Sequence, residues 1–392
     1  MIAVVLWLGA LFAAPEGVDR HYKQAKEAES RQDFARAAQE WKAITALDPN
    51  MAEAFSNLGM MYHFSRQYQK SIEAFRQAQQ LKPELLAPYL FTGIDYYLIG
   101  QPAAAIPQLH HALTLDGGNA EARKWLGMSY MHLGDFAAAA AELSRCPRDE
   151  EILFHLARAY ANVAEGALTR SKAIAAGSPE LAELEGQVAA ASKQALDTID
   201  EFAALAPNSW RADQLRAEYH RARGEEDGAL RAYEQALAKN PQAIQIHLAI
   251  GNIYATRREW DQAIRHYQDE LKADPYSAKA LERMGQVHAD LHHGGEATRY
   301  LLQAIALDPK LPEVHKALGK IYLQQSDPAR AVTHLRRALA LGATQDPTVY
   351  FQLSKALRLK GEISEAEKNE AILKKLLTEK RSKAVRAFAN PE

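Results

Sequence analysis

A regular spacing of prolines restricts the possible folds of this chain more than any other sequence feature. Pro49 and Pro83 lie 34 residues apart, and the same interval separates four consecutive prolines farther along, Pro207, Pro241, Pro275 and Pro309. Proline lacks a backbone N–H and disfavours helical conformation in the residue before it, so each of these positions predicts the end of a helix. A constant period of this length indicates a chain built from repeated structural units.

Each 34-residue repeat reads as two short helices joined by a polar turn. Residues 52–85 are the best copy, with small residues at positions 8, 20 and 27 of the repeat and aromatic residues at positions 4, 11 and 24. The former are Gly59, Ser71 and Ala78, and the latter are Phe55, Tyr62 and Phe75. Small residues let helices approach closely, and aromatic side chains fill the space that is left. Neither helix can bury its apolar side alone, so the repeats must stack on one another.

The period and the residue pattern resemble the tetratricopeptide repeat family, in which each repeat is a pair of antiparallel helices. Ten such repeats cover residues 18–380. The glycine of position 8 recurs as Gly93, Gly127, Gly251, Gly285 and Gly319. The resemblance implies an all-α fold, a right-handed superhelical solenoid of stacked antiparallel helix pairs.

The repeats fall into two blocks separated by a longer repeat. Residues 18–149 hold repeats one to four, and residues 210–380 hold repeats six to ten. Repeat five, residues 150–209, contains about 26 extra residues that are rich in helix formers and broken once, at Ser178-Pro179, a pair typical of a helix start. We expect a projecting helical hairpin over residues 166–187, which either pads the junction or acts as a docking or oligomerisation arm. Residues 381–392 are expected to form a basic C-terminal cap or tail.

The first seventeen residues, MIAVVLWLGALFAAPEG, contain an uncharged apolar run. The run matches the apolar part of a secretory signal in length and is shorter than the ~20 residues of a membrane-spanning helix. We expect a signal peptide or an apolar anchor over residues 1–17, and therefore export to a bacterial periplasm or envelope. No basic residue precedes the run and no small-x-small cleavage site follows it, so a buried capping helix in a cytoplasmic protein is the alternative. Contact with a membrane is expected only through this segment, if it is not cleaved.

Composition and motifs argue against several classes of function. A net charge of −2 gives no general reason to expect nucleic acid as a partner. Cys146 is the single cysteine, so an intrachain disulfide is impossible. The sequence contains no glycine-rich phosphate loop, no nucleophile elbow and no cysteine-histidine spacing of a metal site. We therefore predict a protein that is not an enzyme and that needs no cofactor, metal or small-molecule substrate.

In the tetratricopeptide repeat family, the first helix of each repeat lines a concave groove, and the resemblance implies which residues face it. In repeats two to four these are mostly apolar: Met60, His63, Phe64, Leu90, Ile94, Tyr97, Met128 and Met131. Methionine and aromatic surfaces can adapt to varied apolar side chains. We predict a peptide-binding or protein-binding apolar groove here. Burial of these residues between repeats, or their coverage by the N-terminal apolar run, is the alternative.

The corresponding residues in repeats eight to ten are basic. They are Lys279, Arg283, Lys316, Lys320, Lys355 and Arg358. Such a surface suits an acidic peptide segment or a terminal carboxylate. Glu282 and Asp290 lie among these residues, so partial neutralisation is the alternative. Lys279 and Arg283 match part of the carboxylate clamp of chaperone-binding family members, but the rest of that clamp is missing.

The predicted function is a protein–protein interaction scaffold that binds an extended peptide or a partner protein in its groove. The predicted export would place this scaffold in envelope assembly or secretion. Two alternatives remain open. One is an accessory or regulatory subunit of an enzyme, such as a glycosyltransferase system, and the other is a structural protein that assembles through the hairpin of repeat five.

Overall fold

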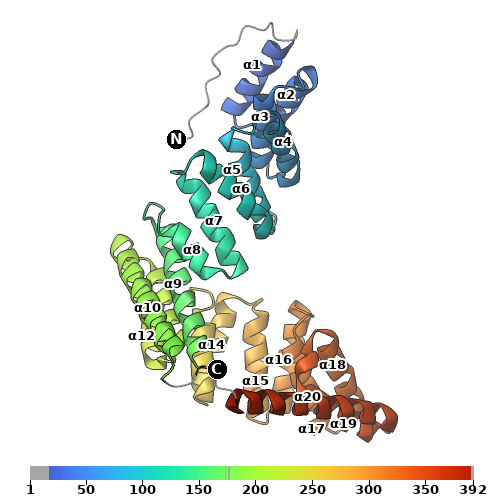
Figure 1. The fold of residues 1–392 in the computed structure, drawn as a ribbon. Coiled ribbons are helices and arrows are strands. Elements are labelled where there is room, and N and C mark those ends of the chain that lie inside the picture. The colour runs from blue at the N-terminus through green and yellow to red at the C-terminus, as the bar shows by residue number, and fades with distance from the viewer. Residues whose placement is uncertain (1–16, 173, 175–176, 390–392) are drawn as a thin grey trace. The chain divides into compact units, whose positions relative to one another are not determined.

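The computed structural model describes residues 17–172, 174 and 177–389, with side chains as far as Ser382. Regular structure in these ranges is helical and no strand occurs there, which confirms the all-α prediction (Figure 1). Of the predicted signal peptide or anchor, residues 1–16 lie outside the described residues, so it stays a prediction. Among the described helices, none combines the length and the apolar character that crossing a membrane requires.

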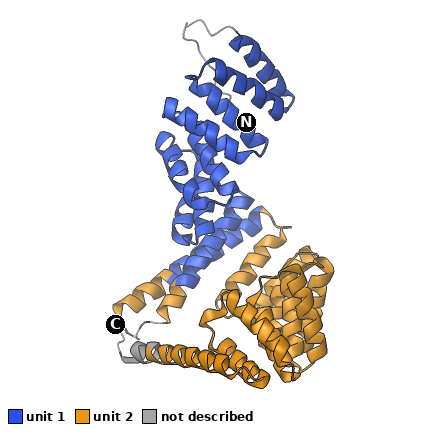
Figure 2. Cartoon of the chain, turned by 90° about the vertical axis from the view of Figure 1, so that its right-hand side faces the viewer, with its two compact units in different colours: residues 1–166, 188–205 blue, residues 167–187, 206–392 orange. Residues whose placement is uncertain are grey.

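The chain divides into two compact units, called unit 1 and unit 2 below (Figure 2). Unit 1 comprises residues 1–166 and 188–205, and unit 2 comprises residues 167–187 and 206–392. The helices that lie wholly in unit 1 are α1 (Val18–Ser30), α2 (Phe34–Leu47), α3 (Ala52–Phe64), α4 (Tyr68–Leu81), α5 (Leu86–Leu98), α6 (Pro102–Leu115), α7 (Ala120–Leu133) and α8 (Phe136–Leu143).

Two long helices, α9 (Glu150–Ser171) and α10 (Pro179–Leu205), have parts in both units. The helices that lie wholly in unit 2 are α11 (Trp210–Ala222), α12 (Glu226–Lys239), α13 (Ile246–Thr256), α14 (Trp260–Ala273), α15 (Ala278–Asp290), α16 (Gly294–Leu307), α17 (Pro312–Gln324), α18 (Pro328–Ala340), the short 3-10 helix η1 (Ala343–Gln345), α19 (Pro347–Lys360) and α20 (Ile363–Ala389). The described residues thus form ten consecutive pairs of α-helices, which agrees with the ten predicted repeats.

Short local signals begin and end these helices. Asp33, Asn119 and Asp327 each precede a helix and accept a hydrogen bond from the backbone N–H three residues further on, at 3.0, 2.9 and 2.9 Å. These caps satisfy N–H groups of the first turn that otherwise lack a partner. Gly134 and Gly361 end α7 and α19 with φ of 80° and 84°. Glycine adopts this left-handed conformation without steric cost, so the chain can turn back into the next helix.

The close approach predicted at position 8 of the repeat is present in both units. A Cβ atom on Gly59 would lie 2.6 Å from the ring of Phe75, and one on Gly251 would lie 2.5 Å from the ring of Tyr267. Both rings are fully buried. In four other repeats the same contact is made by a buried leucine: Leu109 at Gly93, Leu143 at Gly127, Leu301 at Gly285 and Leu335 at Gly319. A side chain at position 8 would therefore force the two helices of a pair apart.

Repeat five has two lengthened helices. α9 has 22 residues and α10 has 27, compared with 13 and 14 in the first repeat. Pro179 is the first residue of α10, and the backbone N–H of Leu181 donates a hydrogen bond to Ser178 Oγ at 3.1 Å. Ala164 and Leu184, in the lengthened region, are buried. The predicted docking or oligomerisation role of this hairpin stays a prediction.

The start of α13 departs from the repeat pattern, and a buried carboxylate accepts hydrogen bonds from the backbone N–H groups at this start. Gln245 adopts a φ of 73°, and the helix begins only at Ile246. Glu270, which is fully buried, stands at position 27 of this repeat, where neighbouring repeats have Ala236 and Ala304. Its carboxylate accepts hydrogen bonds from the Gln245 N–H at 2.9 and 3.1 Å and from the Leu248 N–H at 3.2 Å. Glu270 thus caps the first turn of α13 from the second helix of the pair.

Candidate protein-binding surfaces

The predicted apolar groove residues lie on the first helices of three consecutive repeats in unit 1. They are Met60, His63 and Phe64 on α3, Leu90, Ile94 and Tyr97 on α5, and Met128 and Met131 on α7. Phe64 is exposed, and six of the others are partly buried. Ile94 is only 5% exposed and belongs to the core. This corrects the predicted groove, because a side chain packed inside α5's repeat cannot contact a ligand.

His63 is held by a buried carboxylate that the repeat pattern did not predict. His63 Nδ1 lies 2.6 Å from Asp95 Oδ1, and the Asp95 side chain is fully buried while that of His63 is 15% exposed. Asp95 stands at position 10 of its repeat, where Met61 and Ile253 stand in others. An acidic residue at an otherwise apolar position was the available signal in the sequence. The contact fixes the orientation of the imidazole and leaves Nε2 as the ring nitrogen for a ligand.

The first aromatic cluster surrounds His63 and consists of Phe34, His63, Phe64 and Phe91. The ring centroid of Phe64 lies 5.1 Å from that of Phe34, and the ring centroid of His63 lies 5.0 Å from that of Phe91. Aromatic rings at these separations attract one another beyond the effect of burial alone. The cluster therefore joins α2 and α3 to α5 and forms a continuous apolar surface across neighbouring repeats.

The second aromatic cluster consists of Tyr97, Trp125 and His132. Tyr97 on α5 lies edge-on to both rings of α7, with centroid distances of 5.1 Å to Trp125 and 5.9 Å to His132. Burial, together with the negative charge of Glu151, raises the pKa of the Tyr97 hydroxyl, so the phenol stays neutral. The groove positions that the family resemblance implies do not include Phe91, Trp125 or Asp95.

Lys124, the basic residue beside the second aromatic cluster, is neutralised. Its Nζ lies 3.1 Å from Glu151 and 3.8 Å from Glu121. Burial acts to lower the pKa of Lys124, but the two glutamates outweigh it and the pKa is raised. The surface of α3, α5 and α7 thus presents aromatic rings, methionines and one oriented imidazole.

Three of the six predicted basic groove residues in unit 2 are engaged in ion pairs. Lys279 Nζ lies 2.9 Å from Glu282, and Lys316 Nζ lies 2.5 Å from Asp346 and 2.8 Å from Glu313. Arg358 binds both carboxylate oxygens of Glu370, at 2.6 and 2.8 Å. Glu370 raises the pKa of Arg358, so this pair is charged throughout the ordinary pH range. Lys279, Lys316 and Arg358 therefore pair with carboxylates of the chain itself and are less available to an acidic ligand.

The remaining three basic residues, Arg283, Lys320 and Lys355, have no ion-pair partner among the residues that the structure describes. Lys320 and Lys355 are exposed and occupy position 9 of adjacent repeats, on α17 and α19. The structure therefore reduces the predicted basic groove to three free cations. Glu282 pairs with Lys279, as the alternative of partial neutralisation expects, whereas the pairing of Asp346 and Glu370 with basic residues is not predicted from the sequence.

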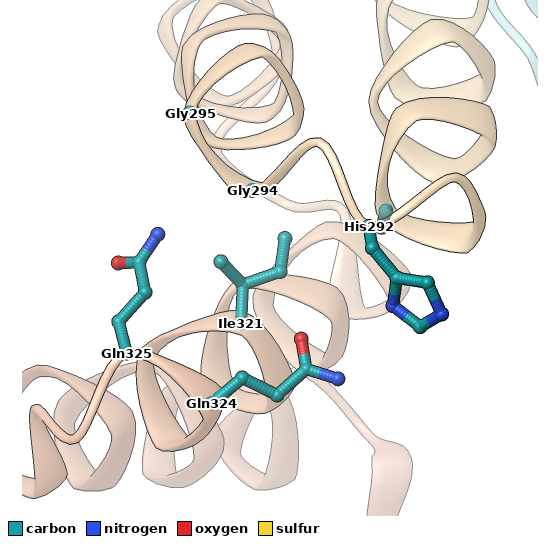
Figure 3. A pocket seen from close by; sticks show the side chains of 7 residues that line it. His292, Gly294, Gly295, Ile321, Gln324 and Gln325 are labelled. Atoms are coloured by element: carbon teal, nitrogen blue, oxygen red, sulfur yellow. The ribbon is translucent and has the colours of Figure 1, made fainter.

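A pocket of about 520 Å³ opens beside the turn between α15 and α16 in unit 2 (Figure 3). Its lining is Ala289, His292, Gly294, Gly295, Ile321, Gln324 and Gln325. The figure shows the two glutamine amides and the ring of His292 at its edge, with Ile321 as the large apolar contact. This lining offers hydrogen bonds but little apolar floor, unlike a typical small-molecule site. In the described ranges no three His, Cys, Asp or Glu side chains are placed to hold a metal ion.

Stacked pairs of short helices with glycine-mediated contacts define an α-solenoid of the tetratricopeptide repeat class. Family models described as tetratricopeptide repeat match residues 22–85 and 100–151. A further model, described as cilia and flagella-associated protein 70 C-terminal domain, matches residues 156–387, more than half of the chain. The chain therefore belongs to the family of that domain, within the tetratricopeptide repeat proteins. A comparison with curated protein sequences gives no match.

Similar solved structures include the C-terminal part of a TPR repeat-containing protein from Cytophaga hutchinsonii and yeast Tom70. The first is 16% identical, with 67% of this chain and 99% of that chain covered and a TM-score of 0.48. The second is 14% identical, with 95% of each chain covered and a TM-score of 0.43. The APC/C hetero-tetramer Cut9-Hcn1 is also similar, at 14% identity, 93% and 88% coverage and a TM-score of 0.40. Similarities of this size indicate nothing about the partners of this chain.

Proposed function

We propose that the chain is a scaffold that binds an extended apolar segment of a partner protein across α3, α5 and α7 of unit 1. The observation that carries the proposal is the pair of aromatic clusters, which join the first helices of successive repeats and leave apolar side chains at the surface. Phe64, Leu98 and Leu133 are 36%, 42% and 49% exposed. Repeat proteins use such rows of helices as extended binding surfaces, and membership of the family supports the general class of function.

The chemistry of this surface favours a ligand with apolar and aromatic side chains and little charge. Met60, Met128 and Met131 are flexible enough to fit side chains of different shapes. Because Glu121 and Glu151 neutralise Lys124, the surface has no free cation at that point to favour an acidic ligand. His63 adds one hydrogen-bonding group of fixed direction, which would set the register of the bound segment.

The double variant Tyr97→Ala with Met128→Ala tests this proposal. Peptides selected from a random library on the full-length chain are expected to be rich in apolar residues. The double variant should bind them about 10- to 30-fold more weakly, because it removes the ring of the second aromatic cluster and an adaptable neighbour. Fluorescence anisotropy measures the affinity, and circular dichroism checks that the helix content is unchanged.

Leu377→Ala is the control for this experiment. Leu377 is an exposed apolar residue, 51% exposed, on α20 in unit 2. Its loss should leave peptide affinity unchanged. Wild-type affinity in the Tyr97/Met128 double variant would show that the apolar surface is not the binding site.

A second binding surface in unit 2 is favoured by the three free cations Arg283, Lys320 and Lys355. We propose that it accepts an acidic peptide segment. Lys320→Gln with Lys355→Gln should weaken binding of an oligoglutamate peptide about 3- to 10-fold at low salt, and salt should abolish the difference because it screens exposed charges. Lys316→Gln, which removes a cation already paired with Asp346, should have a smaller effect. Binding that is independent of salt would contradict this proposal.

A further inference from the structure

Two histidine pairs in unit 2 share one geometry and one place in their repeats. His247 on α13 faces His266 on α14, and His315 on α17 faces His334 on α18. The Nδ1–Nδ1 distances are 3.1 and 3.0 Å. Both members of the second pair follow those of the first by 68 residues, which is two repeats. In each pair, the histidine at position 4 of the repeat, on the first helix, thus meets the histidine at position 23, on the second helix.

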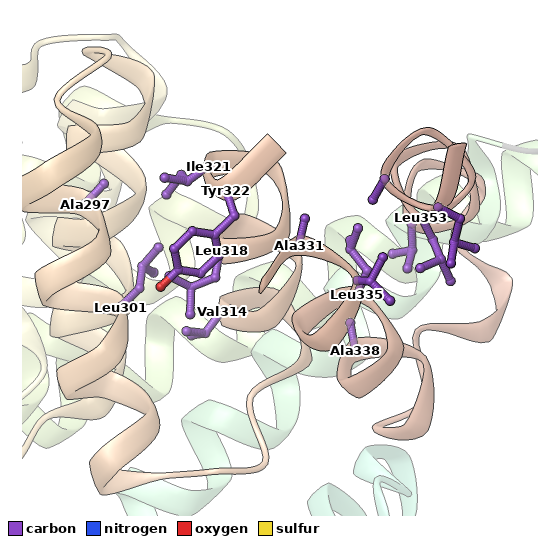
Figure 4. Close-up of a cluster of buried hydrophobic side chains, with 14 of the residues drawn as sticks. Ala297, Leu301, Val314, Leu318, Ile321, Tyr322, Ala331, Leu335, Ala338 and Leu353 are labelled. Atoms are coloured by element: carbon purple, nitrogen blue, oxygen red, sulfur yellow. The ribbon is translucent and has the colours of Figure 1, made fainter. Parts of the chain in front are cut away.

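The surroundings of the two pairs are also repeated. Tyr254 stacks on His266 and Tyr322 stacks on His334, with centroid distances of 5.6 and 5.4 Å. The second pair adjoins the core of unit 2, because Val314 and Leu335, its neighbours in sequence, belong to the buried cluster that also contains Tyr322 (Figure 4). His315 is buried and the other three rings are partly buried.

The rings of each pair meet head-on. The ring centroids lie 5.4 and 5.2 Å apart, which exceeds the Nδ1–Nδ1 distances by the radii of both rings. Each Nδ1 therefore points at the other, and one ring must donate its N–H while the other accepts with its lone pair. A metal ion on the line between the nitrogens would need them about 4.1 Å apart, from two bonds of about 2.0–2.1 Å. The geometry thus fits a shared hydrogen and not a metal ion.

Proton balance limits what such a pair can bind. The donor ring can take a proton on its Nε2 and continue to donate through Nδ1. A second proton would have to go to the accepting Nδ1, at which the N–H of the partner already points. That step breaks the hydrogen bond and places two positive rings in contact. A closed pair therefore holds one added proton, and the second can bind only when the rings separate.

The surroundings of the rings do not favour a second proton on either pair, because they lower the pKa of three of the four histidines. Burial lowers the pKa of His266, with His247 and Arg265 acting in the same direction and Asp269 opposing them. Burial also lowers the pKa of His315 and His334. The charges of His334 and Arg337 act in the same direction on His315, and that of Arg330 does so on His334. A backbone hydrogen bond at Pro309 opposes these effects on the pKa of His315.

In the first and fourth repeats, both in unit 1, the same two positions pair a basic side chain with a carboxylate. His21 Nδ1 lies 2.7 Å from Glu40, and Arg123 lies 2.9 Å from Glu142. Both are pairs between positions 4 and 23 of a repeat, 19 residues apart. In the His21–Glu40 pair a carboxylate oxygen thus stands where the pairs of unit 2 have a second imidazole ring.

We propose that the two histidine pairs make unit 2 acid-sensitive, with the helix pairs α13–α14 and α17–α18 loosening as the pH falls from 7.5 to 5.5. This inference is independent of the proposed binding function. The open rings take up protons with an ordinary pKa near 6.5, whereas the closed pair excludes one proton. The stabilisation by each pair is therefore present above about pH 6.5 and is lost as the pH falls below it. At pH 5.5, the opening equilibrium should rise about tenfold for each pair.

Hydrogen exchange of the full-length chain at pH 7.5 and 5.5, corrected for intrinsic exchange rates, tests the proposal. The opening equilibrium of α13–α14 and α17–α18 should rise about tenfold at the lower pH, while that of α1–α2 should not rise. Two-dimensional NMR of the imidazole nitrogens should show one Nδ1–H ring and one Nδ1 lone-pair ring in each pair at pH 7.5. Equal protection of α13–α14 and α17–α18 at the two pH values would overturn the proposal.

Two sets of variants separate the titration from a merely structural role of these rings. His266→Glu with His334→Glu recreates the His21–Glu40 arrangement in unit 2, and acid should then increase protection of α13–α14 and α17–α18. His266→Asn with His334→Asn places a neutral amide near Nδ1 and should reduce the pH effect to less than threefold. The exposed His292→Asn is the control and should behave as wild type. An unchanged loss of protection in the glutamate and asparagine variants would overturn the proposal.

Discussion

Phe75→Ala should lower the free energy of unfolding of the α3–α5 region by about 3–5 kcal/mol. Phe75 is fully buried, contacts the Gly59 backbone and stacks on Phe91 with the ring centroids 6.0 Å apart. Its removal leaves a cavity between α3, α4 and α5 that the short helices cannot fill without losing the close contact at Gly59. Native-state hydrogen exchange of the amides of α3–α5 measures the loss.

The matched control is Phe64→Ala, which removes the same atoms from a ring that is 36% exposed. We expect a smaller loss of about 1–2 kcal/mol, because a ring that keeps a third of its surface in water gives up less burial and leaves no enclosed cavity. Stability in a repeat protein passes through contacts between neighbours, so the effect of Phe75→Ala should decline from α3–α5 towards α7 and α8. Equal losses in the two variants would contradict the assignment of Phe75 to the core.

Glu270→Ala should destabilise the α13–α14 pair by about 2–3 kcal/mol. The change removes a fully buried carboxylate that accepts hydrogen bonds from Gln245 and Leu248, and hydrogen bonds to charged groups contribute about 1.5–3 kcal/mol. Alanine, which other repeats have at this position, has no side-chain acceptor for the Gln245 and Leu248 N–H groups. These groups need one because α13 begins only at Ile246. The amides of Gln245 and Leu248 should exchange fastest in the variant.

Two controls distinguish capping from a general effect of charge. Glu270→Gln keeps one carbonyl acceptor and should lose about half as much stability as Glu270→Ala. Asp269→Ala removes a neighbouring carboxylate whose ion pair with Lys272 is at the surface, and should cost less than about 1 kcal/mol. If all three variants lost the same stability, the capping role of Glu270 would be wrong.

The repeats and most of the helix boundaries could be predicted from the sequence because they depend on local spacing. The proline at position 32 ends the second helix, and the glycine at position 8 allows the pair to close. The repeat pattern therefore predicts Gly59 and Phe75 as core residues, and both are buried in the structure. The candidate surface was predicted less well. The family positions included the buried Ile94 and omitted Phe91 and Trp125, since exposure depends on how far each repeat overlaps the next.

What the sequence by itself determined is the repeat: a period of 34 residues, ten helix pairs, and the small and large residues that let each pair close. What only the tertiary structure decided is the partner of each residue that departs from the repeat. Asp95 meets His63 across 32 residues, Glu270 meets Gln245 across 25, and His315 meets His334 across 19. Such contacts depend on side-chain directions where two helices touch, and the repeat period specifies the helices but not these directions.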